Sequence, residues 1–334
     1  MKENLFAALC CVFMIGLFGC QQAEEIKSSN EELRMSIEAS IGKDGAVAGR
    51  TVTGNNGSVS FANGDEIGLF VNNRSVVKWT YSGQTWGSNG DVYWDNKVDN
   101  HDFCAFYPYV SGATLNDVPM PILTGQTGSV DGLAQYDFLY ATKEQNYIDG
   151  NPDGTVSFSG INAFEHAFSL ISINLKGEGD LVGSTINTIT ISGTDIVTPY
   201  AFSFENLDAV SVSDEPSGVN QLVASVGNVL LTSEGATFYF IVNVGTVALE
   251  NVSLSIGYTK EDNKIYEATY TGMKDNNSQY THFVSGKQYS YSLKVNDGVL
   301  SISGNEINDW ENGVVMNDII INGNEVKPTP TPES

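Results

Sequence analysis

Cationic residues are scarce in this sequence. Its 334 residues include 16 Lys and Arg against 40 Asp and Glu, which gives a formal net charge of −24 at pH 7. Binding to nucleic acid or to an anionic lipid surface needs clustered cations, so the balance argues against both as partners of the protein surface. The charge is typical of an exposed protein that is kept soluble by repulsion.

Cysteine is nearly absent after the first 20 residues. Of the four cysteines, Cys10, Cys11 and Cys20 lie near the N-terminus and only Cys104 follows. No disulfide can form within the chain beyond residue 20. Domains of about 150 residues bury roughly two thirds of their unfolded surface, so neither a disulfide nor a metal is needed for folding. Cys104 is expected to be a small buried residue of an apolar strand.

Motifs for catalysis and metal binding are also missing. The sequence contains no G-x-S-x-G, no P-loop and no nucleophilic Cys–His pair. His101, His166 and His282 are far apart, so local spacing builds no zinc site, and His166 is expected to be structural. We therefore predict no catalytic residues, no metal and no cofactor; an enzyme, such as a hydrolase, is the least favoured class.

One segment copies the beginning of a calcium-binding loop. Asp149–Gly154 follows the pattern D-x-N-x-D-G, but the twelfth position is Gly160 instead of a bidentate glutamate. Pro152 also interrupts the loop. The segment is predicted to form a tight turn.

The N-terminus has the features of an export signal. An apolar run from Leu5 to Phe18 is too short to span a bilayer, and Gly19 and Cys20 follow it. The string Leu17-Phe18-Gly19-Cys20 resembles a bacterial lipobox. We predict a signal peptide over 1–19, lipidation of Cys20 and a polar tether over 20–34. The alternative is an ordinary secretory signal with a chance cysteine.

The remaining chain shows strand periodicity. Short segments with alternating apolar residues recur between turn signals, and helical periodicity never extends beyond about ten residues. This pattern predicts an all-β protein with two antiparallel β-sandwiches in tandem. We place the domains at 35–160 and 161–322, followed by a flexible Pro/Thr tail over 323–334.

The first expected strand stands apart from the others. Met35, Ile37, Ala39 and Ile41 alternate with polar residues, which predicts a strand with one buried face. A turn-rich stretch over 42–57, which contains Arg50, separates it from the next strand.

Aromatic residues gather in the first half of the chain. They are Trp79, Tyr81, Trp86, Tyr93 and Trp94. Exposed rings could stack on sugars, whereas rings on alternate strand positions would pack in the core. Core packing is the favoured interpretation.

A set of short strings, in order over about residues 35–312, resembles the fimbrillin family of Bacteroidales, the Mfa-like subunits of major and minor fimbria. The strings are Phe61-x-x-Gly64-Asp65-x-Ile67-Gly68-Leu69-Phe70, Tyr93-Trp94, Phe103-x-Ala105-Phe106-Tyr107-Pro108-Tyr109, Asp137-Phe138-Leu139-Tyr140-Ala141, Phe164-Glu165-His166-Ala167-Phe168-Ser169, Gly286-Lys287-x-Tyr289-x-Tyr291-x-Leu293-x-Val295 and Ile307-x-x-Trp310.

The resemblance implies a fold, a location and a mode of assembly. The fold is two transthyretin-like antiparallel β-sandwich domains. The location is the outer membrane and cell surface, reached as a lipoprotein and held to the membrane through the lipid anchor only. An arginine-specific protease would then remove the N-terminal strand, and a strand from another fimbrial subunit would fill the groove. The implied function is that of a fimbrial subunit or accessory adhesin in cell adhesion, with host or bacterial surface ligands as optional partners.

The resemblance assigns roles to particular segments. The displaced strand is Met35, Ile37, Ala39 and Ile41. Arg50 is the expected cleavage site, since cutting at Arg34 would leave the strand in place. The candidate donor residues are Val314, Val315, Met316, Ile319, Ile320 and Ile321. Alternatively, these residues form an ordinary last strand of the second domain. For the function as a whole, the alternative is a monomeric glycan-binding lipoprotein on the outer-membrane surface.

Overall fold

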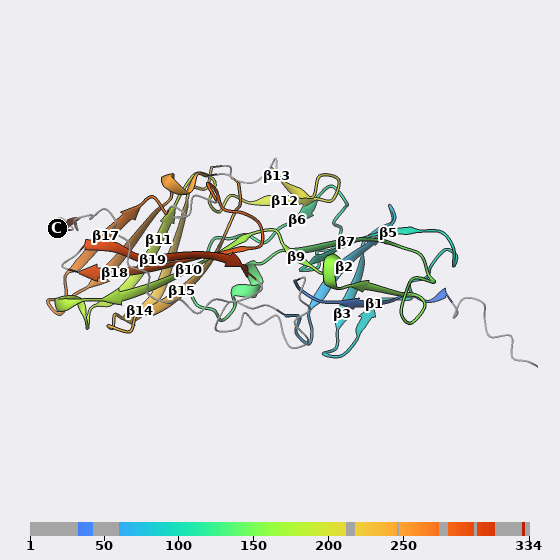
Figure 1. Ribbon diagram of the computed structural model, residues 1–334, viewed down its shortest axis with the longest axis horizontal. Helices are drawn as coiled ribbons and strands as arrows, with labels where there is room; N and C mark the ends of the chain where they lie inside the picture. Colours follow the sequence, from blue (N-terminus) through green and yellow to red (C-terminus); the bar gives the residue numbers. More distant parts are fainter. Residues whose placement is uncertain are drawn as a thin grey trace, which may run out of the picture.

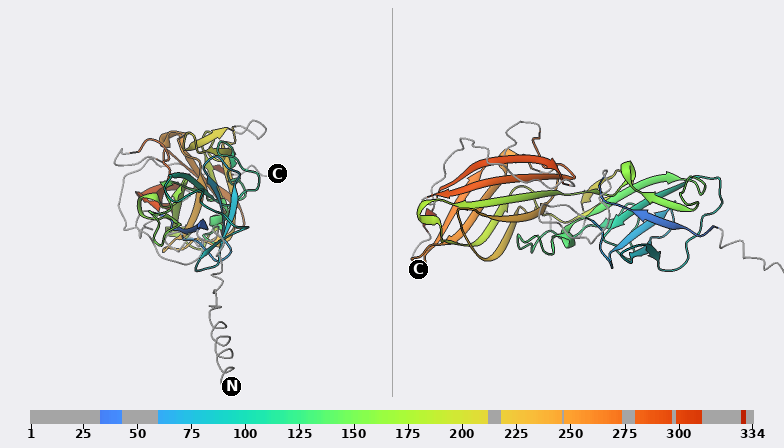
Figure 2. Two further views of the ribbon diagram at one scale, coloured as in Figure 1. Left: turned by 90° about the vertical axis from the view of Figure 1, so that its right-hand side faces the viewer. Right: turned by 60° about the horizontal axis from the view of Figure 1, so that its bottom comes forward.

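β-Strands, most of them paired antiparallel, are the main secondary structure of the described residues. The computed structural model describes residues 33–42, 60–211, 218–245, 247–273, 280–296, 299–310 and 329–330. The strands form two groups that lie end to end along the long axis (Figures 1 and 2). The helices of the described residues are short 3-10 turns such as η2 (Leu133–Tyr136) and η3 (Gly160–Asn162). None of the described helices has the length and apolar character needed to span a membrane.

The first group is built on a six-stranded antiparallel sheet with the strand order β4-β3-β2-β5-β7-β9. Its strands are β2 (Glu66–Val71), β3 (Val77–Tyr81), β4 (Trp86–Ser88), β5 (His101–Tyr107), β7 (Leu139–Gln145) and β9 (Glu165–His166). A second, two-stranded sheet consists of β1 (Ser36–Ala39) and β8 (Thr155–Phe158). The apolar side chains of both sheets belong to one core.

The second group contains two larger sheets with the orders β15-β10-β18-β19 and β14-β11-β16-β17-β20. The strands of the first are β10 (Ser169–Gly177), β15 (Ala236–Val242), β18 (Lys287–Asn296) and β19 (Val299–Asp309). Those of the second are β11 (Thr185–Ser192), β14 (Gln221–Leu230), β16 (Ser253–Thr259), β17 (Ile265–Thr271) and β20 (Thr329–Pro330). Alternate residues such as Leu254 and Ile256 are buried, as period-two patterning predicts.

A small sheet joins the two halves of the sequence. β6 (Val118–Pro119) pairs with β12 (Tyr200–Ser203), which also pairs with β13 (Asp208–Ser211). The ring of Phe202 lies 4.6 Å from that of Tyr140 and 5.3 Å from that of Phe138. Residues from the second half of the chain therefore cover the outer face of the six-stranded sheet.

A glycine in β2 makes room for an aromatic layer under this cover. A Cβ atom at Gly68 would lie 2.3 Å from ring carbons of Phe106, so a side chain there would displace the ring. The Phe106 ring stacks between those of Phe70 and Phe138, at centroid distances of 5.7 and 6.3 Å. Close approach of this kind is a recognised reason for glycine inside a strand.

The two groups meet at a buried polar cluster. Nδ1 of His166 lies 2.8 Å from Oδ2 of Asp137, and both side chains are almost fully buried. The His166 ring stacks on Trp310, with 3.8 Å between ring centroids. The backbone N–H of Trp310 donates to the carbonyl of Gly286, so the end of β19 is fixed at this junction. His166 is structural, as predicted.

Three features differ from the predictions. β9 pairs with β7, so a boundary between residues 160 and 161 would cut the six-stranded sheet, and a division after His166 follows the hydrogen bonding. β1 and β8 are parallel, as are β10 and β18, because long connections permit parallel pairing. Within the tail predicted to be flexible, Thr329–Pro330 pairs with β17, whose edge offers free backbone groups. The division into two domains itself stays a prediction.

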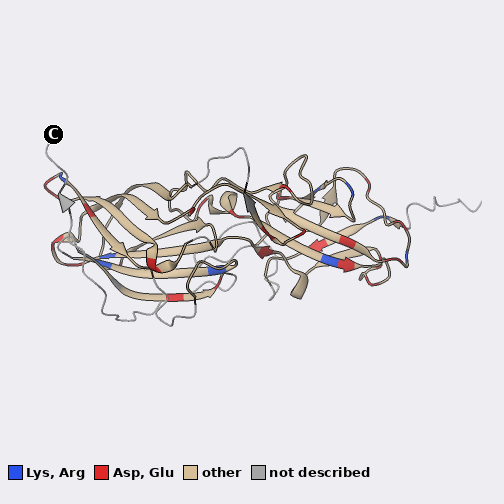
Figure 3. Cartoon of the chain, turned by 90° about the horizontal axis from the view of Figure 1, so that it is seen from above, with Lys and Arg blue, Asp and Glu red and all other residues tan. Residues whose placement is uncertain are grey.

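Charge on the molecule follows the composition. Asp and Glu outnumber Lys and Arg along the drawn strands and loops of both groups (Figure 3). Ion pairs between exposed groups, such as Arg34 with Asp91 at 2.7 Å, contribute little to stability individually. Apolar burial is the main stabilising term of this fold.

The packing of Trp310 at this junction predicts that its substitution lowers the stability of the protein. Replacing Trp310 with Ala should lower the free energy of unfolding by about 3–5 kcal/mol, because a large buried ring is lost without replacement. Chemical denaturation measures this change. Ile161→Ala is the control, since Ile161 is 86% exposed and should change little. A Trp310→Ala chain as stable as the parent would contradict the packing described.

Candidate functional site

The site consists of the N-terminal strand β1 and of the residues that pair with it. These are residues 154–158 and Phe164, which we call the seat of β1. The backbone N–H of Ser36 donates to the carbonyl of Gly154 at 3.2 Å, and that of Ser40 donates to Phe158 at 2.9 Å. The pairing continues beyond β1, where the N–H of Gly42 donates to Phe164 at 3.0 Å and the N–H of Phe164 donates back to Ser40 at 2.9 Å. The whole segment is thus held along one edge by β8 and its continuation.

The other edge of the segment is held only at its beginning. Arg34 forms an antiparallel bridge with Tyr93, and the N–H of Met35 donates to the carbonyl of Val92 at 2.8 Å. Past Met35, no strand among the described residues pairs with this edge of β1. A strand with one paired edge can leave a sheet without breaking any other ladder.

The inward face of β1 supplies apolar side chains to the core. Met35, Ile37 and Ile41 are 4%, 5% and 4% exposed, whereas Ala39 is only partly buried. At about 1.5–3 kcal/mol for each fully buried side chain, these three contribute about 5–9 kcal/mol before ordering costs. Removal of the segment would therefore leave an apolar groove as well as unpaired backbone groups.

Two aromatic residues lie directly beside the segment, since Phe158 pairs with Ala39 and Phe164 forms a bridge with Ile41. The ring of Phe61 lies 5.0 Å from that of Trp86 and 5.2 Å from that of Phe164, which in turn lies 5.6 Å from that of Phe158. These rings belong to the same core as Ile37. They come from elements other than β1, so they would remain after its removal.

The turn at Asp149–Gly154 supports the entry of β1. The carbonyl of Gly154 accepts from the indole N–H of Trp94 at 3.0 Å as well as from Ser36. Thr155, the next residue, places its hydroxyl oxygen 2.8 Å from that of Ser36. The turn prediction is confirmed, but no local pattern indicates that this turn pairs with the first strand.

The predicted site residues differ in how far the structure describes them. Met35, Ile37, Ala39 and Ile41 lie on β1 or its immediate flanks, and the alternation of their burial follows the predicted pattern. Arg34 sits at the start of the segment, so a cut there would leave β1 in place. The lipidation site Cys20, the cleavage site Arg50 and the donor residues Val314–Met316 and Ile319–Ile321 lie outside the described residues.

The aromatic cluster of the first half packs inward, as favoured from the sequence. Trp79, Trp86 and Trp94 are buried, while Tyr81 and Tyr93 are partly buried. Trp94 packs edge-on against Phe103 at 5.2 Å. These tryptophans offer no exposed platform on which a sugar could stack.

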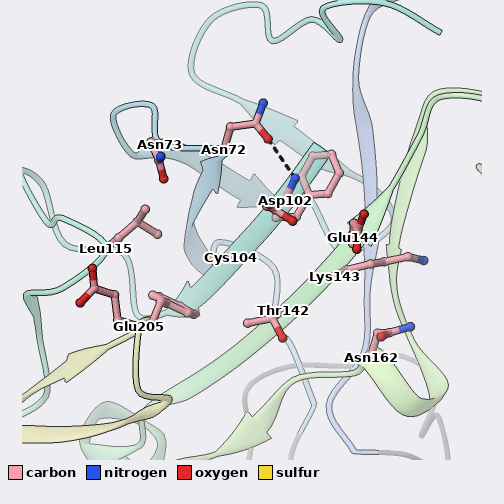
Figure 4. A pocket seen from close by; sticks show the side chains of 12 residues that line it. Asn72, Asn73, Asp102, Cys104, Leu115, Thr142, Lys143, Glu144, Asn162 and Glu205 are labelled. Atoms are coloured by element: carbon pink, nitrogen blue, oxygen red, sulfur yellow. Dashed lines mark hydrogen bonds between the residues drawn. The ribbon is translucent and has the colours of Figure 1, made fainter. Parts of the chain in front are cut away.

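A cavity of about 490 Å³, lined by both polar and apolar side chains, lies where the cover of the six-stranded sheet ends (Figure 4). Asp102 and Cys104 of β5, Thr142 and Glu144 of β7, and Asn72 line it. The amide oxygen of Asn72 accepts from the N–H of Asp102 at 2.9 Å, as the figure shows, so part of this lining is already satisfied. Both phenylalanines that border the cavity are buried, and it therefore lacks an exposed ring for sugar stacking.

The only cysteine of the described residues lines this cavity. Cys104 is partly buried, and burial raises the pKa of its thiol to about 11, with a smaller contribution from the charge of Asp102. The thiolate is the reactive form, so little of it exists at neutral pH. Cys104 is structural in character, although less buried than the sequence predicted.

The chain matches one protein family and resembles several solved structures. Residues 50–310 match the model of a family described as fimbrillin-like. A structure from Bacteroides uniformis, of a proposed cell adhesion protein, has 19% identity and a TM-score of 0.54 and covers 83% of this chain and 99% of its own. A second such structure, from Bacteroides ovatus, has 17% identity and a TM-score of 0.53 and covers 85% of this chain and 99% of its own. No curated protein matches the sequence.

The two structures support the fold, and the extent of the family match bears on the site. The match begins at residue 50, after β1, and ends at Trp310. The part of the chain that carries the family pattern therefore includes the seat of β1 but not β1 itself.

The burial of Ile37 predicts that its substitution weakens the pairing of β1 with β8. Replacing Ile37 with Ala should lower the free energy for opening the β1–β8 pair by about 2–5 kcal/mol, since buried methyl groups are lost. Amide hydrogen exchange over Thr155–Phe158 measures this opening. Glu38→Ala is the matched control, because Glu38 is exposed on the same strand. Equal exchange in both variants would show that β1 is not held by its inward face.

Proposed function

The chain belongs to the fimbrillin-like family, and on that premise we propose that it is a fimbrial subunit or accessory adhesin that assembles by exchange of its N-terminal strand. The observation that carries this proposal is the placement of β1. It is a short strand paired along one edge by β8, and the other edge is bonded only at Met35. Ile37 on the strand is buried, as are Met35 and Ile41 on its flanks, and the strand precedes the part of the chain that matches the family.

Export would come first in this scheme. The apolar run before Cys20 would direct the chain out of the cytoplasm, and lipidation of Cys20 would tether it to the outer membrane at the cell surface. β1 follows shortly after the tether. In the uncleaved chain it fills its own groove, which keeps the adhesive edge covered during transport.

Cleavage would then separate β1 from the rest of the fold. Arg50 lies between β1, which ends at Ala39, and the strand β2, which begins at Glu66. A cut after Arg50 leaves β1 bound only by the hydrogen bonds and apolar contacts described above. Arg34 precedes β1, so a cut there cannot release the strand from the sandwich.

A strand from a second subunit would replace β1. After β1 has left, the edge of β8 would present unpaired backbone groups and the groove would present apolar surface. Strand addition requires both. Incoming side chains with the same alternation restore both the ladder and the burial. Polymer growth would need no cofactor and no catalytic residue, and its partners are other fimbrial subunits and an arginine-specific protease.

A glycan-binding lipoprotein is the second candidate, and the cavity lined in part by Asp102 and Glu144 is the observation in its favour. The buried tryptophans remove the aromatic platform on which that candidate depended. Adhesion to host or bacterial surfaces is compatible with either candidate. Strand exchange is preferred because it accounts for the separate position of β1.

Cleavage at Arg50 predicts an assembly phenotype. Treatment of the purified chain with an arginine-specific protease should give polymers that persist in SDS without heating, visible as a ladder on gels. Arg50→Ala should abolish the ladder, because β1 stays linked to its own subunit. Arg34→Ala is the matched control and should polymerise like the parent. Normal polymers from Arg50→Ala would refute the role of Arg50.

A further inference from the structure

β8 has a backbone ladder along one edge only. Successive carbonyls of a strand point to opposite edges, and those of Gly154 and Phe158 accept from the segment that contains β1. Thr155 and Ser157 occupy alternate positions, so their carbonyls point away from β1. Among the described residues, no strand other than β1 pairs with β8. The second edge of β8 therefore needs hydrogen-bond donors that do not come from a ladder.

Two side chains of β7 supply these donors. Nζ of Lys143 donates to the carbonyl of Ser157 at 3.0 Å, and Nε2 of Gln145 donates to the carbonyl of Thr155 at 2.7 Å. The donors are two residues apart on β7, so both project from the same face of that strand. Figure 4 shows the side chain of Lys143 extending away from Asp102, which lines the cavity on the other face. The two side chains bridge β7 and β8 where no backbone ladder joins them.

These donors have little access to water. Gln145 is 4% exposed, and Lys143 is partly buried. Burial lowers the pKa of Lys143, and the charge of Asp149 acts in the opposite direction. A buried donor without a partner is costly, so each of these groups is strongly biased toward keeping its carbonyl. Neither hydrogen bond includes an atom of β1, and both can therefore persist after β1 has left.

The empty groove would rely on these two hydrogen bonds for its shape. Loss of β1 removes the ladder but leaves the buried side chains of Val156 and Phe158 in the core. Apolar burial is non-directional, so it does not fix the direction in which backbone groups point. Hydrogen bonds are directional and fix the carbonyls of Thr155 and Ser157. Because successive carbonyls alternate, the carbonyl of Val156 then stays turned toward the groove.

We propose, resting on the strand-exchange function above, that Lys143 and Gln145 are positioning residues that hold β8 extended while the groove is empty. They keep the backbone groups of β8 in the orientation that an incoming strand needs. Preorganisation of this kind reduces the ordering cost of binding. The groove thus stays ready for a strand between the loss of β1 and its replacement.

Hydrogen exchange on the full-length chain tests this role. Ile37→Asp places a carboxylate in an enclosed position and should expel β1, which the loss of protection at the N–H of Ser40 verifies. The N–H groups of Gly154 and Thr155 donate to carbonyls within residues 147–152. Their exchange therefore reports whether β8 stays in place and does not depend on bonds to β1.

The two donors are removed in this Ile37→Asp background. Lys143→Met together with Gln145→Met should raise the exchange rate of both amides about tenfold, because β8 is then free to open. Lys143→Met alone should give part of the increase, and Lys143→Arg, which keeps a donor, should give none. Lys78→Met is the matched control, since Lys78 lies on the same sheet and pairs with Glu66 at 2.8 Å. With Ile37 intact, the double substitution should change exchange little, because β1 holds β8.

Assembly gives a second measurement. After cleavage by an arginine-specific protease, the chain with Lys143→Met and Gln145→Met should polymerise about fivefold more slowly than the parent, and Lys143→Arg should match the parent. If Ile37→Asp prevents folding, these rates decide the inference.

Three results would overturn the inference. They are equal exchange with and without the two donors, an equal increase when β1 is in place, and equal polymerisation rates. Failure of the parent chain to polymerise would instead refute the proposed function, and the exchange measurement would still decide the role of Lys143 and Gln145.

Discussion

The parallel pairing of β1 with β8 is the interaction that holds the N-terminal segment in its groove. It combines one row of backbone hydrogen bonds with the burial of Met35, Ile37 and Ile41. The hydrogen bonds contribute modestly, since water competes for the same groups, whereas the apolar side chains supply most of the free energy. The strand-exchange proposal requires that a second strand with the same apolar side chains can make the same interaction.

The larger sheets of the fold do not include β1. The six-stranded sheet is complete without β1, and β12 from the second half of the chain covers its outer face through Phe202. The buried pair of His166 and Asp137, stacked on Trp310, fixes the junction between the two groups of strands. The same junction fixes the point where the C-terminal region leaves β19. Loss of β1 would leave the pairing of the six-stranded sheet and of this junction unchanged.

Much of this fold could be predicted from local pattern, because alternation shows which face of a strand is buried. Alternation predicts the strand at 35–41 and the burial of the tryptophans, and turn-forming residues predict the turn at Asp149–Gly154. Alternation does not show which strand lies beside which, so the parallel partner β8 and the pairing of β6 with β12 were missed. The pair of Asp137 and His166 depends on tertiary contact over 29 residues, and no local signal marks it.

A disulfide that reversibly links β1 to β8 would show whether strand exchange occurs at this groove. The hydroxyl oxygens of Ser36 and Thr155 are 2.8 Å apart, so Ser36→Cys and Thr155→Cys in a Cys104→Ala background place a disulfide between β1 and β8. The oxidised chain, cut by an arginine-specific protease, should remain monomeric, and addition of a reductant should start polymerisation. Polymers that form equally well with the disulfide intact would contradict strand exchange at this groove.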